Sequence, residues 1–192
     1  NWKSKSDIPK EYTGNCYAGG YALEVKNGRI TWSKNMKTNK ITRPGSKKST
    51  VKTKKLKGSY YKIISKSKRT VQYVKPVKKN IISVTIPSSI KLNGKRYKVT
   101  GIAANAFKNC KKLKKVTIGI NVNSIGKRAF YGCSKLQTIK VKTSKLTGSR
   151  VGKQAFKGLN KKAVIKVPKK QLKAYKRLFR AKGVGKKVTI KK

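Results

Sequence analysis

The sequence repeats an Ala-Phe pair three times, and this repetition constrains the fold more strongly than any other feature. The pairs end at Phe107, Phe130 and Phe156, which are 23 and 26 residues apart. A Cys or Leu follows each Phe after three residues, and a strand-like Val or Ile follows after nine. Such periods are typical of solenoids, in which stacked coils bury apolar faces that one coil cannot bury alone. The pattern predicts about three coils, each with a strand, a turn and a helical or 3₁₀ return.

Two of these segments resemble the BspA-type leucine-rich repeat family. They are I-A-A-N-A-F-K-N-C-K-K-L-K-K-V-T-I at 102–118 and I-G-K-R-A-F-Y-G-C-S-K-L-Q-T-I-K-V at 125–141. The resemblance extends over about 60–192, and it departs from the family pattern at Gly119, where Pro is usual, and at Leu159, which replaces Cys. It implies an α+β, β-rich solenoid that is secreted or lies on the surface of a bacterium and binds components of a host or neighbouring cell.

A β-rich cap is predicted before the repeats, over residues 59–100. Leu92-Asn93-Gly94-Lys95 places Asn-Gly between apolar runs, which is the strongest short-range signal for a β-hairpin. The leucine-rich repeats with a helical C-terminal cap then occupy 101–192. In that cap, an apolar stripe of Leu172, Tyr175 and Phe179 predicts a helix packed against the last coil.

The N-terminal region, residues 1–58, is predicted to be a β-hairpin segment followed by a linker. Val25–Ile30 contains a second Asn-Gly pair, and residues 34–58 are rich in Lys, Ser, Thr, Asn and Gly, as a linker or long loop is. No family resemblance is identified for residues 1–50. No secretory signal opens the sequence, so Asn1 is interpreted as the start of a mature or trimmed product.

The charge of the chain is extreme. The formal net charge is +51, and residues 25–192 contain 51 Lys and Arg but no acidic residue. Asp7, Glu11 and Glu24, the three acidic residues, are matched by three lysines within residues 1–24. Like charges oppose a compact state, so the fold either has a robust core or normally sits among anions. Lys greatly outnumbers Arg, which favours attachment to anionic polymers over sequence-specific reading of nucleic acid.

Several kinds of chemistry have no residues to support them. The chain has no His, no pair of carboxylates in the repeats and no Gly-rich phosphate loop, and its cysteines lack metal-ligand spacing. The sequence therefore predicts no catalytic residue, no metal site, no cofactor and no enzymatic activity. No apolar run reaches the roughly 18 residues of a transmembrane helix.

Cysteines and phenylalanines recur at matching repeat positions and are expected to form the core. Cys110 and Cys133 are interpreted as small buried residues stacked on each other, the alternative being a disulfide or redox pair. Cys16 could be a free thiol, an intermolecular link or a core residue. The predicted structural core comprises Phe107, Cys110, Phe130, Cys133 and Phe156.

Lysines also recur in register on the repeats, and they are the predicted binding residues. Lys140 and Lys166 alternate with apolar strand neighbours, so they should stack about 4.8 Å apart on the outer face of a sheet. The full predicted set for binding anionic polymers is Lys111, Lys112, Lys114, Lys115, Lys135, Lys140, Lys161, Lys162, Lys166, Lys169 and Lys170.

Three functions are compatible with this surface. The leading hypothesis is a secreted or cell-surface adhesion module that binds teichoic acid, sulfated or sialylated glycans, or extracellular nucleic acid. A second is a structural subunit of an extracellular fibre or surface layer, since the ends of a solenoid can self-assemble. A third is a cationic protein that binds nucleic acid without sequence preference or disrupts membranes.

Overall fold

The structure is a computed structural model that describes residues 14–18, 21–26, 29–35, 40–42 and 53–192. The chain divides into two compact units, Asn1–Thr50 and Val51–Lys192. The first unit contains four strands in its described part, β1 (Gly14–Ala18), β2 (Tyr21–Lys26), β3 (Arg29–Asn35) and β4 (Lys40–Thr42). Neighbouring strands pair antiparallel in that order, and Leu23 and Val25 of β2 are buried. The Asn27-Gly28 turn and the side chain of Cys16 lie outside the described residues.

The second unit is a solenoid whose coils share one parallel sheet. In the described part of the chain this sheet has five strands, β8 (Ser83–Ile86), β11 (Lys115–Ile118), β13 (Thr138–Val141), β14 (Val164–Lys166) and β15 (Thr189–Lys191). The three Ala-Phe repeats supply the middle strands, while β8 and β15 extend the stack by one strand at each end. The predicted leucine-rich-repeat fold is therefore confirmed.

A second ladder runs along the opposite side of the coils. It joins β7 (Thr70–Pro76), β10 (Lys95–Ile102) and β12 (Ser124–Ile125) in parallel and ends at a bridge from Ile125 to Val151. The coils of β8, β11 and β13 thus contribute one strand to each ladder, the coil of β14 adds only the Val151 bridge, and apolar side chains from both ladders fill the interior.

The return segments of the repeats are successive turns, so the expectation of a helical or 3₁₀ return is wrong for these coils. Each return contains two left-handed residues four positions apart: φ is +58° at both Asn105 and Asn109, and +55° at Arg128 and +70° at Gly132. With these turns, every second amide of the return points sideways, toward the next coil, rather than along a helix axis. The amide of Phe107 donates to Ala129 O (2.7 Å) and the amide of Phe130 donates to Ala155 O (2.8 Å).

An aromatic column passes through the centre of the stack. The rings of Phe107 and Phe130 are 5.0 Å apart and nearly parallel, and those of Phe130 and Phe156 are 5.4 Å apart. Tyr73 of β7 stacks on Phe107 at one end, and Phe179 meets Phe156 edge-on at the other. All five rings are fully buried. The column therefore links both caps to the repeats.

The N-terminal cap is a sheet that includes β5 (Thr53–Leu56), β6 (Ser59–Ser65), β7, β9 (Ser89–Leu92) and β10. The predicted hairpin is confirmed, because β9 and β10 pair antiparallel around Asn93 and Gly94, with φ of +47° and +74°. Strands β4 and β5 both lie within 34–58, which was expected to be a linker or long loop. These residues form strands because β4 pairs with β3 and β5 pairs with β6, and no local sequence pattern indicates either pairing.

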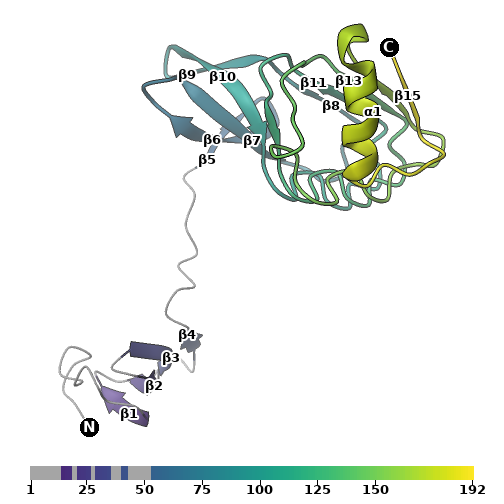
Figure 1. Ribbon diagram of the computed structural model, residues 1–192. Helices are drawn as coiled ribbons and strands as arrows, with labels where there is room; N and C mark the ends of the chain where they lie inside the picture. The colour runs from purple at the N-terminus through teal and green to yellow at the C-terminus, as the bar shows by residue number, and fades with distance from the viewer. Residues whose placement is uncertain (1–13, 19–20, 27–28, 36–39, 43–52) are drawn as a thin grey trace. The chain divides into compact units, whose positions relative to one another are not determined.

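The C-terminal cap is a 3₁₀ turn at Lys169–Gln171 followed by α1 (Leu172–Ala181), which lies beside the last coils at the end opposite the capping sheet (Figure 1). Tyr175 and Phe179 are its buried residues. The Tyr175 hydroxyl donates to Thr143 O (3.1 Å) and accepts from the Leu146 amide (3.1 Å), so its polar end is satisfied. No helix of the described residues has the length and apolar character to cross a membrane.

Candidate functional site

A row of three lysines lies on the outer face of the parallel sheet. Lys140 of β13, Lys166 of β14 and Lys191 of β15 are direct register partners, and all three are exposed. Adjacent strands lie about 4.8 Å apart, so the side chains leave the sheet at that spacing. We call these three residues the sheet row. Toward the N-terminal end the same row continues as Thr117 and Thr85, so only its three C-terminal positions are charged.

A second row lies where the chain approaches each strand. Lys112, Lys135, Lys161 and Lys186 each stand four residues before an inward-facing strand residue, and those strand residues pair in register. All four lysines are exposed, one on each of four successive coils. We call them the turn row. Lys186 and Lys191 were missed in the sequence analysis because their coil lacks an Ala-Phe pair. The signal that identifies them is their position relative to Ile190, which matches the position of Lys161 and Lys166 relative to Ile165.

The remaining predicted lysines are exposed but belong to neither row. Lys115 stands between Ser83 and Thr138 in the register, so it has no lysine beside it on the sheet. Lys162 occupies the repeat position that Leu113 and Leu136 fill in the preceding coils, and the neighbouring Ala163 is buried instead. The other members of this group are Lys111, Lys114, Lys169 and Lys170.

These lysines have no acidic partner in their own unit. Residues 51–192 contain 43 Lys and Arg and no Asp or Glu. A shallow depression brings Lys140, Lys142, Lys166 and Lys192 around Val167 and Pro168, at the C-terminal end of the sheet. Ammonium groups this close repel one another, and an anion placed among them would relieve that repulsion.

The two cysteines of the repeats lie in the core and are free thiols. The Cys133 thiol donates to Phe107 O (3.1 Å), which satisfies it inside the stack. Burial raises the pKa of Cys133 to about 12, and burial also raises the pKa of Cys110, against a smaller lowering by Lys79. Because the thiolate is the nucleophilic form, neither residue is placed to act as a nucleophile. Within the described residues, no three His, Cys, Asp or Glu side chains gather as a metal site would require.

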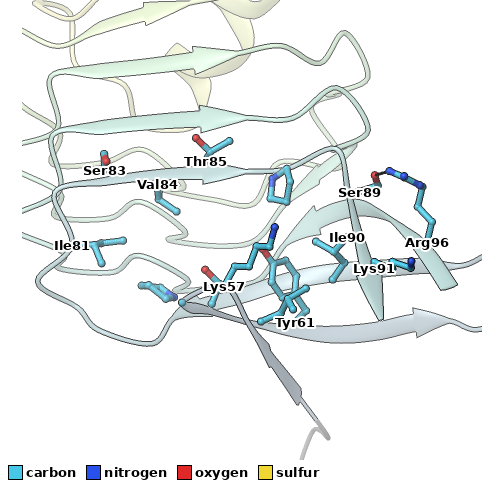
Figure 2. Close-up of a pocket in the computed structure, with 15 residues that line it drawn as sticks. Lys57, Tyr61, Ile81, Ser83, Val84, Thr85, Ser89, Ile90, Lys91 and Arg96 are labelled. Carbon is cyan, nitrogen blue, oxygen red and sulfur yellow. Dashed lines mark hydrogen bonds between the residues drawn. The ribbon is translucent and has the colours of Figure 1, made fainter. Parts of the chain in front are cut away.

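A pocket of about 740 Å³ lies between β8 and the capping sheet (Figure 2). Ser83, Val84 and Thr85 of β8 form one side, and Tyr61 and Ile90 of the capping sheet lie opposite. Its other lining residues are Leu56, Lys57, Gly58, Ser59, Pro76, Ile81, Pro87, Ser89, Lys91 and Arg96. No sequence signal pointed to this pocket, since it is formed by two elements whose strands belong to different sheets.

Comparison with protein families gives one match. The BspA-type leucine-rich repeat region matches residues 78–192, with six copies of the repeat. A comparison with curated proteins gave no significant match.

Solved structures of bacterial leucine-rich repeat proteins also match part of the chain. A leucine-rich cell surface protein from Faecalibacterium prausnitzii A2-165 is 21% identical, with a TM-score of 0.47 over 61% of this chain and 37% of that one. A leucine-rich repeat protein from Bacteroides ovatus ATCC 8483 is 23% identical, with a TM-score of 0.44 over 58% and 36%. One from Bacteroides capillosus ATCC 29799 is 25% identical, with a TM-score of 0.47 over 61% and 83%. This chain spans little more than a third of the length of the first two proteins.

Proposed function

This chain belongs to the BspA-type leucine-rich repeat family, and from that premise we propose that it is a non-enzymatic binding module, secreted or on a bacterial surface, that attaches to anionic polymers. The polymer is bound by the sheet row and the turn row, which act as point charges. Teichoic acid and sulfated or sialylated glycans carry the repeated negative charge that such rows match. Lys169 and Lys170, just beyond the sheet row, extend the same positive surface.

The observation that carries the proposal is the register of the lysines. A solvated lysine that serves only solubility needs no particular place in a repeat, and mixed or acidic charge would serve solubility as well. Here Lys140, Lys166 and Lys191 occupy one register position on three neighbouring strands. Regular spacing of one charge per coil is complementary to a polymer, whose charges also repeat, rather than to a compact ligand.

The chemistry of the charged groups favours attachment without sequence reading. Lysine offers a mobile point charge, whereas arginine offers the planar fork that recognises a base or a single phosphate in a fixed geometry. Both rows consist of lysine alone. Extracellular nucleic acid is therefore a possible polymer only through its phosphates, and binding to one preferred sequence would contradict the proposal.

The test is retention on immobilised heparin and on teichoic acid across a salt series. The variant Lys140→Gln/Lys166→Gln/Lys191→Gln removes the sheet row. Its matched control, Lys55→Gln/Lys68→Gln/Lys95→Gln, removes the same charge from exposed positions of the capping sheet. We expect the row variant to elute at clearly lower salt than the wild type. The slope of log affinity against log salt should also be shallower than that of the wild type, by about two to three.

Two results would contradict the proposal. Equal losses in the row variant and in the control would show that net charge alone binds the polymer, without a defined surface. Retention that does not change between about 50 and about 500 mM salt would exclude an electrostatic mechanism altogether, because exposed charges are strongly screened over that range.

A further inference from the structure

The two ladders of the solenoid end differently on the N-terminal side. The ladder that contains Tyr73 continues past β7, because β6 and then β5 add to it in the capping sheet. The ladder that contains β8 does not continue: within the described residues, β8 pairs with β11 on one edge and with no strand on the other. The pocket lies at that open edge (Figure 2). It therefore occupies the place that one more strand would take.

The backbone hydrogen bonds show which groups of β8 face this vacant place. In every later coil, the first residue of the strand donates its amide to the preceding coil. These bonds run from Lys115 to Ile82 O (3.2 Å), from Thr138 to Lys114 O (3.0 Å), from Val164 to Gln137 O (2.8 Å) and from Thr189 to Ala163 O (2.9 Å). Ser83 stands at the same register position in β8. Backbone groups alternate along a parallel strand, so the amides of Ser83 and Thr85 point toward the pocket.

The side chains around the open edge suit an extended peptide. Val84 projects from β8 into the pocket, and Ile81, Ile90 and Tyr61 line it from the neighbouring segments (Figure 2). Val84 is only partly buried, unlike Val116 at the same position of the next strand. A strand added to β8 would place alternate side chains over this apolar surface, which is how strand addition gains specificity.

The rim of the pocket is positive. Lys57, Lys91 and Arg96 line it, and no acidic residue exists in residues 51–192 to neutralise them. The opposite edge of the sheet differs: β15 itself carries Lys191, and charged edge strands discourage pairing with another chain. The outward side chains of β8 are Ser83 and Thr85, which offer no such protection.

We propose that the open edge of β8 is a docking site for an acidic, extended peptide segment of a partner protein, which adds to the parallel sheet as a further strand. Main-chain hydrogen bonds to the Ser83 and Thr85 amides hold the segment, apolar side chains enter the pocket, and acidic side chains meet the rim. This site lies apart from the sheet row and the turn row, and it does not depend on polymer binding by either of them.

The experiment uses the full chain and a fluorescein-labelled Glu-Val-Glu-Val-Glu-Val peptide, with affinity measured by polarisation. Thr85→Pro removes the amide from the open edge without breaking a bond to β11, and we expect it to weaken binding at least about tenfold. Lys57→Gln/Lys91→Gln should weaken binding several-fold. Its matched control is Lys166→Gln/Lys191→Gln, which removes the same charge from the sheet row and should change affinity less than about twofold.

Amide hydrogen exchange on the unmodified chain provides a second readout that holds even if Thr85→Pro fails to fold. Peptide binding should slow exchange at Ser83 and Thr85, which charge attraction alone would not do. Unchanged exchange at both residues would overturn the proposal, as would equal affinity for the Gln-Val-Gln-Val-Gln-Val peptide. A short heparin fragment that displaces the peptide and protects the same two amides would also overturn it, in favour of a glycan site.

Discussion

The inside and the outside of the same coils follow one register but carry opposite chemistry. Inside, Phe107, Phe130 and Phe156 stack at 5.0 and 5.4 Å in a column that is closed by an aromatic residue from each cap. Outside, lysines repeat at the same interval with no Asp or Glu in the unit. The interior contacts attract and the exterior charges repel, so the fold must be held almost entirely by its core.

This difference separates stability from function in the molecule. Core substitutions should unfold the solenoid without any specific effect on binding, while lysine substitutions should change binding and leave the fold intact. The repeat makes both possible at once, because one backbone period places a side chain of each kind at a fixed position in every coil.

The largest effect is expected from Phe130→Ala, in the middle of the column. Its ring is fully buried between the rings of Phe107 and Phe156. Backbone hydrogen bonds between the coils fix the distance between these two outer rings. The cavity cannot collapse fully, so the free energy of unfolding should fall by about 3–5 kcal/mol in urea denaturation. Phe130→Leu is the conservative control and should lose much less. A loss below about 1 kcal/mol for Phe130→Ala would mean that the column does not hold the coils together.

A smaller loss is expected from Gly152→Ala. A Cβ at Gly152 would lie 2.3 Å from the Lys127 backbone nitrogen of the preceding coil, so the coils would have to separate. We expect a loss of about 1–3 kcal/mol in the free energy of unfolding. Gly148→Ala is the matched control, since a Cβ there meets nothing within 4 Å. Equal stability of the two variants would show that the coils tolerate wider spacing.

The buried thiol gives a dependence of stability on pH. The pKa of Cys133 is raised by burial to about 12, so only the unfolded state ionises as the pH passes the ordinary thiol value. The contribution of this group to stability is complete below about pH 8.5 and is lost as the pH rises toward 12. We expect the wild type to lose more stability between pH 8 and pH 10 than Cys133→Ala. Parallel pH profiles for the two proteins would contradict the assigned burial of the thiol.

The smallest effect on stability is expected from Lys166→Gln in the sheet row. The side chain is exposed and lies between Lys140 and Lys191, so its removal relieves repulsion. The free energy of unfolding should rise or stay within about 0.5 kcal/mol of the wild type, and any gain should shrink in high salt. Clear destabilisation in thermal denaturation would show that this lysine packs against the sheet rather than serving only as a charge.

Much of the fold could be predicted because the repeat is written locally. The Ala-Phe interval, the Asn93-Gly94 turn and the apolar stripe of α1 each correspond to a structure that neighbouring residues can form. The turn conformation of the returns could not be predicted in this way. The left-handed residues at Arg128 and Gln154 are not ones that favour it intrinsically, and hydrogen bonds to the next coil decide their conformation.

The candidate surface was only partly predictable for a related reason. Lys140 and Lys166 could be placed beside each other because both follow an Ala-Phe pair at the same interval. Lys191 joins them only because β15 pairs with β14, and its coil is formed by α1 rather than by a repeat. The pocket beside β8 is likewise lined by segments of two different sheets, and no pattern within either sheet reveals it.

The amino-acid sequence by itself determined the solenoid, the unneutralised positive charge, the lack of histidine and the lack of acidic residues in the repeats. These depend on residue identity and on spacing along the chain. Only the tertiary structure decided which lysines form continuous rows, how the aromatic column reaches both caps and where the parallel sheet is left open. Those properties arise from pairing between distant segments, and pairing is settled by the packing of the whole core rather than by any one stretch of chain.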